Sequence, residues 1–216
     1  AEVNGAGSAS LTGTGDTDGN GSTVTLTPSS GTATFTGFQA TYTASGSSDE
    51  TFNLRASSGA LTAADSSQLT ASVTPTINSV SVPSNGTYAT GQNLDFTVNT
   101  SQPMTVNTAS GTPRLSLTIG GSVVYASYIS GSGTSALTFR YTLQAGDLDA
   151  DGISVGALEA NGGTLQDGAG NDLDTTLNSV GSTSSVLVDA VAPTVSSVSV
   201  PSNDLYVAGE NLDFTV

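Results

Sequence analysis

Residues 75–98, PTINSVSVPSNGTYATGQNLDFTV, recur without a gap at residues 193–216 as PTVSSVSVPSNDLYVAGENLDFTV. The two copies begin 118 residues apart (193 − 75) and agree at about two thirds of their positions. A fixed period of this kind indicates a tandem array of domains. We therefore expect a window from a longer array: a partial domain lacking its first strands at 1–74, a complete repeat at 75–192, and the first strands of the next repeat at 193–216.

Apolar and polar residues alternate with a period of two through the complete repeat, which is the pattern of half-buried β-strands. Leu137–Leu143 is the strongest such run, and Gly120-Gly121 is a hairpin-turn signal between two others. About seven to nine short strands with turn signals throughout predict an all-β fold of tandem Ig-like β-sandwich domains. A β-solenoid is the alternative, but it requires a much shorter internal period.

The first 74 residues contain looser runs of the same type, at 24–26, 33–38, 52–54 and 69–73. Together with the last 24 residues they have the length of one Ig-like domain, about 100 residues. We therefore expect 193–216 of one copy to complete the N-terminal sheet of the next. The connection is either covalent, in a longer array, or strand donation between chains. Alternatively, the two ends are unrelated pieces of an arbitrarily cut segment.

The charge balance is strongly acidic: 18 Asp and Glu against three Arg and no Lys, for a net charge of −15. Nucleic acids and anionic lipids both reward clustered basic residues, so neither is an expected partner. No apolar run is long enough to span a membrane, so membrane insertion is not expected. Multivalent cations are favoured, because clustered carboxylates repel one another unless they are neutralised.

The absence of histidine and cysteine removes the usual general base, thiolate nucleophiles, disulfides and the common zinc ligands. Paired carboxylates alone can serve a glycosidase, but here the acids lie in turn-like loops and there is no Trp to stack a sugar. The sequence therefore predicts no enzyme activity.

The sharpest chemical motif places carboxylates at alternate positions, Asp147, Asp149 and Asp151, before Gly152. Hard oxygen ligands and a tight glycine turn are what Ca²⁺ requires. The motif departs from an EF-hand loop because its twelfth position is Leu158 and its flanks are strands. It predicts a calcium loop of a β-sandwich, and a solvated Asp-Gly turn is the alternative.

A second acidic loop follows, with Asp167, Asn171 and Asp172, and the two loops are candidates for one shared calcium site. Asp189 precedes the second copy and is a candidate to stiffen that junction through calcium. The equivalent position before the first copy is Ala71 (189 − 118), so the two junctions are expected to differ in stiffness. Similar but weaker ligand candidates are Asp16, Asp18 and Asn20. Asp49 and Glu50 are interpreted as a solvated turn.

The complete repeat resembles the calcium-binding Ig-like repeats of giant bacterial surface adhesins and of hemolysin-type (RTX) calcium-binding proteins. The resemblance covers about 75–216, and residues 1–74 are more loosely similar to another Ig-like repeat type. It rests on GQNLDFTV at 91–98, GTPRLSL at 111–117, LTFRY at 137–141, AGDLDADGI at 145–153, NGGTLQDGAGN at 161–171 and VDAVAP at 188–193. One departure is Gln102-Pro103, where many such repeats carry an acidic residue. The glycine-rich nonapeptides of the hemolysin family are absent.

The resemblance implies a structural extender, or stalk, of a secreted bacterial surface adhesin, rigidified by Ca²⁺ and placed outside the cell. Neighbouring copies of itself, arranged head to tail, are the expected partners. A subunit of an extracellular filament or surface layer, assembled by β-strand complementation, is the alternative. A ligand-binding module is the third reading, and Tyr88 and Tyr206 are its best aromatic candidates.

Overall fold

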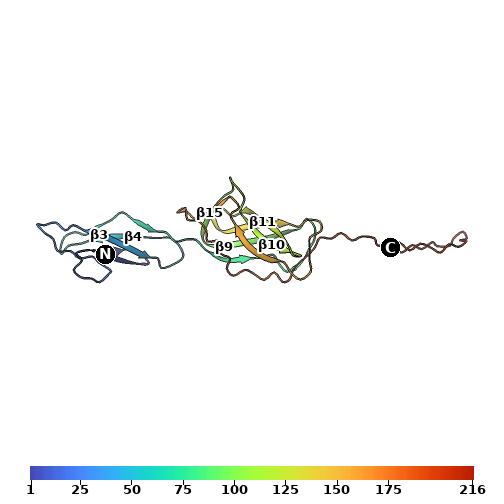
Figure 1. Ribbon diagram of the computed structural model, residues 1–216, viewed down its shortest axis with the longest axis horizontal. Helices are drawn as coiled ribbons and strands as arrows, with labels where there is room; N and C mark the ends of the chain where they lie inside the picture. The colour runs from blue at the N-terminus through green and yellow to red at the C-terminus, as the bar shows by residue number, and fades with distance from the viewer.

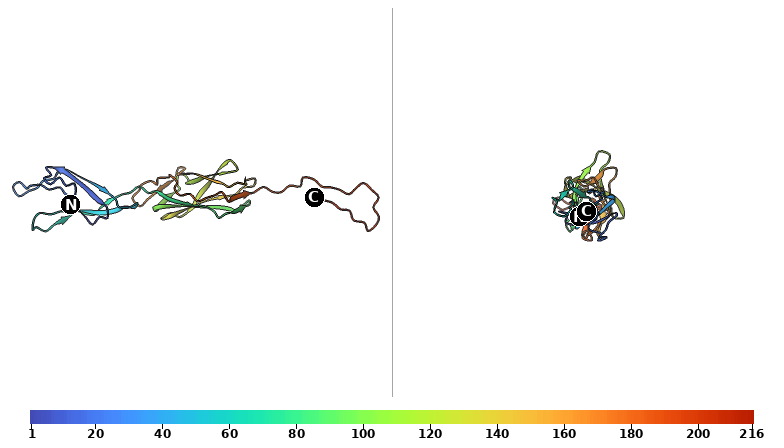
Figure 2. Two further views of the ribbon diagram at one scale, coloured as in Figure 1. Left: turned by 90° about the horizontal axis from the view of Figure 1, so that it is seen from below. Right: turned by 90° about the vertical axis from the view of Figure 1, so that its left-hand side faces the viewer.

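A computed structural model describes all residues from 1 to 216 and contains strands, turns and loops but no helix. Figure 1 shows two strand-rich units in a line, followed by a thin extended segment. Viewed along that line, the units stack behind one another, so the molecule is long and narrow (Figure 2). The chain is therefore all-β with several sheets, an arrangement consistent with a β-sandwich. No helix in it has the length and hydropathy needed to cross a bilayer.

The middle unit comprises strands β7 to β16 and corresponds to the complete repeat. Their bounds are β7 Ile77–Ser81, β8 Gly86–Tyr88, β9 Asn93–Asn107, β10 Arg114–Ile119, β11 Ser122–Ser130, β12 Thr134–Thr142, β13 Leu148–Asp149, β14 Ser154–Glu159, β15 Thr164–Gln166 and β16 Val186–Asp189. One sheet has the order β14-β10-β11-β12-β9-β15, with β7 also paired to β9. A second sheet has the order β13-β16-β8. The main strands and the hairpin at Gly120-Gly121 occur where the sequence predicts them.

The main hydrophobic core lies in the middle unit, as one cluster of 20 buried residues. Phe96 of β9 lies opposite Phe139 of β12, and both are fully buried. The apolar residues of β9, β10 and β12 face inward at alternate positions, as the period-two pattern requires. This cluster holds the middle unit together. The junctions to the segments before and after it lie at the two ends of this unit.

The N-terminal unit comprises β1 to β6, with bounds β1 Glu2–Val3, β2 Ser8–Thr14, β3 Thr36–Thr43, β4 Glu50–Ala56, β5 Ala64–Asp65 and β6 Leu69–Ala71. β2 pairs only with β3, while β4 pairs with β1, β5 and β6. Leu11 and Phe52 are its only buried hydrophobic residues. This unit is thus a thin pair of sheets with little core.

In the N-terminal unit one predicted strand is wrong and one observed strand was not predicted. Residues 24–26 form no strand, although Thr25 accepts a backbone hydrogen bond from Thr17. β2 was missed because SASLTGT has a single large apolar residue, Leu11, so its alternation is nearly invisible. Small residues leave a strand without a periodic signal even where the backbone ladder forms.

Residues 193–216, the C-terminal hairpin, leave the middle unit and turn back on themselves without touching either unit (Figure 1). One bridge, between Ser199 and Thr215, closes the hairpin. Within one chain, therefore, the expected completion of the N-terminal sheet by this segment does not occur.

Candidate functional site: the junction between the units and the acidic loops

The linker between the two units, residues 72–76, is held from both sides by hydrogen bonds. From the N-terminal unit, Asp49 Oδ1 accepts the backbone N–H of Val73 at 2.7 Å and the hydroxyl of Ser72 at 3.2 Å. The carboxylate thus fixes two consecutive linker residues. The interpretation of Asp49 and Glu50 as a solvated turn is wrong, since Glu50 also accepts hydrogen bonds from Ser45 and Tyr42.

From the middle unit, Gln102 reaches the same linker. Its Nε2 donates to the carbonyl of Val73 at 2.7 Å, and Gln102 is a buried residue of β9. The amide of Asp174 donates to the carbonyl of Pro75 at 2.9 Å, and the amide of Ser101 donates to the carbonyl of Thr76 at 2.8 Å. Val73 is therefore bound through its N–H by one unit and through its carbonyl by the other.

The second acidic loop lies against this junction. Asn171 Nδ2 donates both to the hydroxyl of Ser72 and to Asp167 Oδ2. Asp167 is buried, and its Oδ1 accepts the amides of Ala169 and Asn171 at 2.9 and 2.8 Å. Burial acts to raise the pKa of Asp167, but the hydrogen bonds from Asn171, Ala169 and Gly170 outweigh it and hold that pKa below its ordinary value. The ionised carboxylate thus organises a turn that supports the linker.

The first acidic loop lies at the opposite end of the middle unit. Asp149 is buried, with Oδ2 accepting the amide of Gly120 and Oδ1 that of Gly152, each at 2.8 Å. Asp147 Oδ2 accepts the hydroxyl of Tyr141 at 2.9 Å and the amide of Gln144 at 2.8 Å. The two carboxylates therefore accept hydrogen bonds from the backbone of different turns. Asp151 is exposed.

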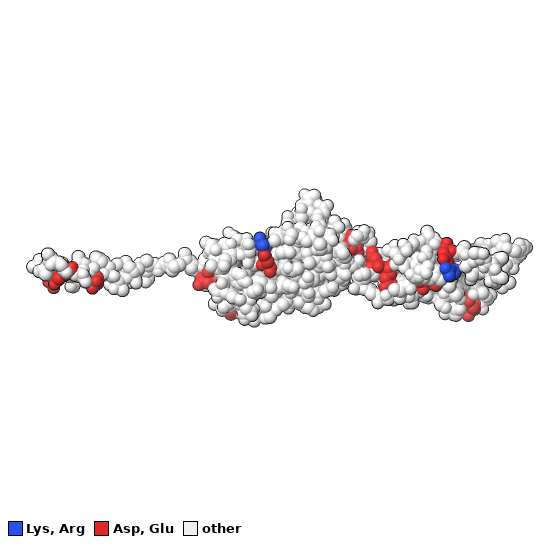
Figure 3. Space-filling model, turned by 180° about the vertical axis from the view of Figure 1, so that it is seen from behind, with Lys and Arg blue, Asp and Glu red and all other residues white.

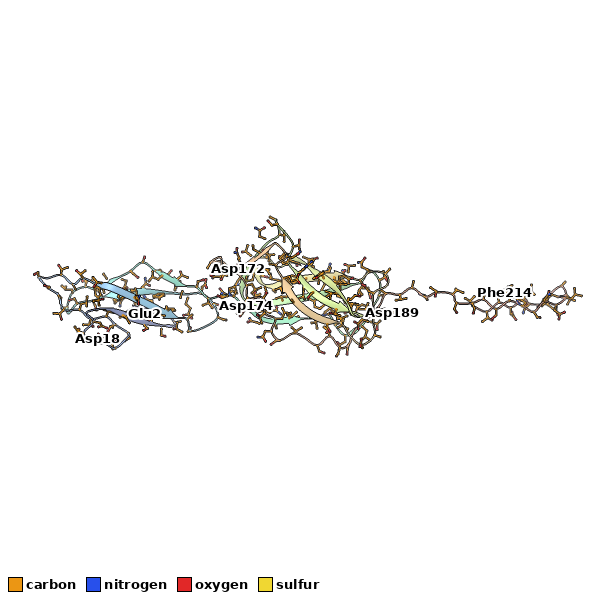
Figure 4. All side chains as sticks on the ribbon, viewed as in Figure 1. Glu2, Asp18, Asp172, Asp174, Asp189 and Phe214 are labelled. Atoms are coloured by element: carbon orange, nitrogen blue, oxygen red, sulfur yellow. The ribbon has the colours of Figure 1, made fainter.

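The two acidic loops are not one site. Figure 4 places Asp172 and Asp174 at the end of the middle unit that faces the N-terminal unit, and Asp189 at the other end. Asp189 lies beside the first loop, because it pairs with Leu148 between β13 and β16. The expectation that the loops share one calcium ion is thus wrong.

The N-terminal acidic loop is likewise closed by its own hydrogen bonds. Asp16 Oδ1 accepts the amides of Asp18 and Thr25, and Asn20 Oδ1 accepts those of Ser22 and Thr23. Hydrogen bonds from the hydroxyls of Thr25 and Thr23 hold the pKa of Asp18 below its ordinary value. This pattern is that of Asx-type turns, in which a short polar side chain caps the backbone beyond it.

These carboxylates do not fit a preformed calcium cage. Ca²⁺ takes six to eight oxygen ligands, typically from several carboxylates and carbonyls at once. The structure brings together no group of three or more acidic side chains that could hold a metal ion. Figure 3 shows acidic side chains along one face in separate places, one of them near the junction. Asp147, Asp149, Asp167 and Asp189 each cap a turn, whereas Asp151 is exposed and Asp172 accepts a hydrogen bond from the side chain of Gln166.

The two junctions differ in how firmly hydrogen bonds hold them. The difference is opposite to the one expected from Asp189. Asp189 Oδ1 accepts only the amide of Val191, at 3.3 Å. Ala190 forms backbone hydrogen bonds with Asp147 and Gly146. Residues 191–198, which follow it, form no backbone hydrogen bonds. The first junction, which has Ala71 where the second has Asp189, is therefore the one that hydrogen bonds hold from both sides.

The residues that clamp the first junction were largely missed from the sequence. Gln102 was noted only as a departure from related repeats, and Asp49 as a surface turn. One signal was present: a polar Gln at an inward position of a strand whose inward face is mostly apolar. Such a buried amide needs a partner, and here the partner is the linker.

Comparison with protein families, curated proteins and solved structures finds no match to this chain.

Proposed function

We propose that this chain is a structural extender, a stiff segment of a stalk on a secreted bacterial surface adhesin built of tandem Ig-like domains. The observation that carries the proposal is the clamped linker between units joined end to end (Figure 1). Val73 donates a hydrogen bond to the N-terminal unit, and Val73 and Ser72 accept hydrogen bonds from the middle unit, which restricts the relative rotation of the two units. Each bond contributes about 0.5–1.5 kcal/mol net, and several at one hinge act together.

The composition supports a mechanical role outside the cell. A chain with no histidine, no cysteine and no lysine offers little for catalysis or nucleic-acid binding. Its net charge of −15 causes electrostatic repulsion between neighbouring stalks and between a stalk and an anionic surface. We propose no enzyme activity and no membrane insertion for this segment.

The test measures the angle between the units. Because the chain has no cysteine, spin labels attach only at introduced sites. Ser48→Cys and Thr108→Cys put exposed labels on the two units, and Thr108→Cys with Ser122→Cys puts both on the middle unit as a control. An extender predicts a distance distribution across the junction nearly as narrow as the control. A broad distribution would overturn it.

Calcium stiffening is a separate proposal that rests on the charge and on the resemblance, not on a formed cage. The acidic loops occupy both ends of the middle unit, where an ion would neutralise carboxylates next to each junction. Differential scanning calorimetry in calcium and then in excess chelator is the test. A higher melting temperature with calcium supports the role, and superimposable curves remove it while leaving the extender intact.

A further inference from the structure

The first and last segments of the middle unit run side by side in the same direction. Val80 of β7 forms a parallel bridge with Val180, 100 residues later (180 − 80). The parallel partners of β8 and β16 have the same separation, and they are Gly86 with Val186, Thr87 with Leu187 and Tyr88 with Val188. Every other strand ladder in the molecule is antiparallel. The parallel contacts therefore join the segment by which the chain enters the unit to the segment by which it leaves.

Residues 80–90 and 179–190, the terminal-strand pair, are joined by hydrogen bonds at both ends. Val80 donates to the carbonyl of Ser179 at 3.3 Å and accepts the amide of Gly181 at 2.9 Å. Where β8 begins, Gly86 donates to the carbonyl of Ser185 at 2.9 Å. The β8–β16 ladder continues from there. The two segments are therefore held in one register over about ten residues.

Side chains add to this connection. The hydroxyl of Thr90 donates to the carbonyl of Ala190 at 3.1 Å, beyond the end of the β8–β16 ladder. Val80, Val186 and Val188 are buried in the core. A slip of one segment along the other would therefore break the hydrogen bonds and move these buried valines out of their places at the same time, because register and the buried face of a strand are linked.

The chain enters and leaves the middle unit at opposite ends. The linker before β7 lies on the side of the N-terminal unit, and Asp189, the last residue of β16, lies at the other end (Figure 4). The strands of this unit run roughly along the length of the molecule (Figure 2). Tension along the molecule therefore pulls β7 and β16 in opposite directions, each along its own axis. In this geometry, which is shear, all the bonds between the two segments share the load.

We propose that the terminal-strand pair makes the middle unit a load-bearing link, which resists unfolding when the molecule is pulled from its two ends. Stiffness of a junction fixes an angle between units, whereas this property sets the tension that a unit withstands. The load reaches the hairpin strands β10, β11 and β12 only after the first and last segments separate, since these segments carry the chain into and out of the unit. Strength therefore depends on the direction of pulling, which equilibrium stability does not.

Two introduced thiols define the direction of pulling, because the chain has no cysteine of its own. Asn78→Cys with Val191→Cys holds β7 near its beginning and the chain just beyond β16, which loads the terminal-strand pair in shear. Ala89→Cys with Val191→Cys holds both segments at the same end, which peels them apart one bond at a time. All three positions are exposed. DNA handles on the thiols connect each variant of the full chain to optical tweezers.

The shear variant is expected to unfold at a force at least about twofold higher than the peeling variant at the same loading rate. Forced unfolding follows the unfolding rate, and that rate rises less with force when several bonds share the load. The roughly 100–110 residues between the handles release about 3.3–3.6 Å each, so the jump in length identifies the middle unit. Urea unfolding without load should coincide for the two variants, since a denaturant has no direction.

Thr90→Val tests one bond of the terminal-strand pair. It removes the hydroxyl that reaches the carbonyl of Ala190 and keeps the branched shape of the side chain. Thr142→Val is the matched control, because the hydroxyl of Thr142 donates to Asn93 between β12 and β9, outside the pair. Thr90→Val is expected to lower the unfolding force in shear, and Thr142→Val is expected to leave it unchanged.

Equal unfolding forces in the two directions would overturn the proposal, because strength would then follow stability alone. A Thr142→Val variant that weakens the unit in shear as much as Thr90→Val would do so too, since the whole sheet would then carry the load. The extender function is tested apart from this. Spin labels on the two units report the stiffness of the junction without any load, so a stiff but weak molecule and a strong but flexible one are distinguished.

Discussion

Residues 75–98 and 193–216 have nearly the same sequence and opposite environments. In the first copy Val80, Leu94, Phe96 and Val98 are buried in the core of the middle unit. In the second copy every one of the corresponding side chains is exposed. Since the residues are the same, burial is a property of what surrounds the segment and not of the segment.

Some structure is nevertheless common to both copies. Gly91 and Gly209 both have positive φ, +80° and +99°, at the same turn. Gln92 and Glu210 each cap that turn by accepting the amide three residues earlier. Turn geometry and register are thus encoded within the 24 residues, because they depend on contacts a few residues apart. The sheet and the core depend on strands that lie elsewhere.

Truncation of the shared phenylalanine is the largest test of this comparison. Phe96→Ala is expected to destabilise the middle unit by about 3–5 kcal/mol, because it leaves a cavity opposite Phe139. Phe214→Ala is expected to change the stability by less than about 0.5 kcal/mol, because the side chain is already in water. Urea unfolding at low protein concentration measures both. Equal losses in the two variants would mean that the hairpin is also packed.

The linkers that precede the two copies provide the next test. Gln102→Ala leaves the carbonyl of Val73 without its partner at a partly buried position, at a local cost of about 0.5–1.5 kcal/mol. We expect faster hydrogen exchange at residues 72–76 and a broader spin-label distribution across the junction. Residues 192–198 should already exchange fast in the wild type, because they make no backbone hydrogen bonds.

Gln144→Ala is the control for this variant. The side chain of Gln144 is exposed and donates only to the carbonyl of Thr142 within its own segment, so its loss should leave the junction unchanged. If Gln102→Ala also leaves exchange at 72–76 unchanged, then the clamp is not what holds the linker.

How far the sequence predicts this molecule differs between its parts for a physical reason. The period-two runs of the middle unit predict its strands, because Leu137, Phe139 and Tyr141 each have a polar neighbour facing the other way. The same reasoning fails for β2, where small residues carry no alternation, and for 24–26, where the alternation is present but no strand pairs with it.

The candidate site was predicted less well than the fold. Alternate carboxylates such as Asp147 and Asp149 look alike in the sequence, but each has its own turn, and Asp167 lies beside the linker at the other end of the unit, through Asn171. Whether two acidic residues lie close together in the folded protein depends on the strand topology. Their spacing along the sequence does not reveal that topology. The sequence marks Gln102 as a polar residue at an inward position, but it does not identify the partner, because a backbone carbonyl carries no sequence signal.

A smaller test uses the tyrosine that pairs with the first copy. Burial, together with the hydrogen bond to Asp147, raises the pKa of Tyr141 from 10.0 to about 12. The folded state therefore favours the protonated phenol, so this contribution is complete below pH 10 and is lost as the pH rises from 10 to 12. After allowance for solvent screening it is about 1 kcal/mol.

Tyr141→Phe should accordingly flatten the alkaline part of a stability profile measured by urea unfolding between pH 8 and about 12. Tyr206→Phe is the matched change in the C-terminal hairpin and should leave the profile unchanged, since the hairpin contacts neither unit. A Tyr141→Phe profile that still falls like that of the wild type would assign the alkaline loss to another group.

The smallest test compares two aspartates at the same position of the repeat. Asp95 forms two hydrogen bonds of 2.6 Å with Arg140 across β9 and β12, and these lower its pKa from 3.8. Asp213, its counterpart, has no ion pair. A depressed folded-state pKa gives stability that is present above the ordinary pKa and is lost as the pH falls below about 4.

Because both partners are exposed, the contribution is below about 1 kcal/mol. Asp95→Asn should reduce the acid-dependent loss of stability between pH 5 and about 2, and added salt should reduce the difference from wild type. Asp213→Asn should do neither in the monomer. If it did, the second copy would already be paired with a cationic strand, and the contrast between a covered and an uncovered copy would not describe the protein in solution.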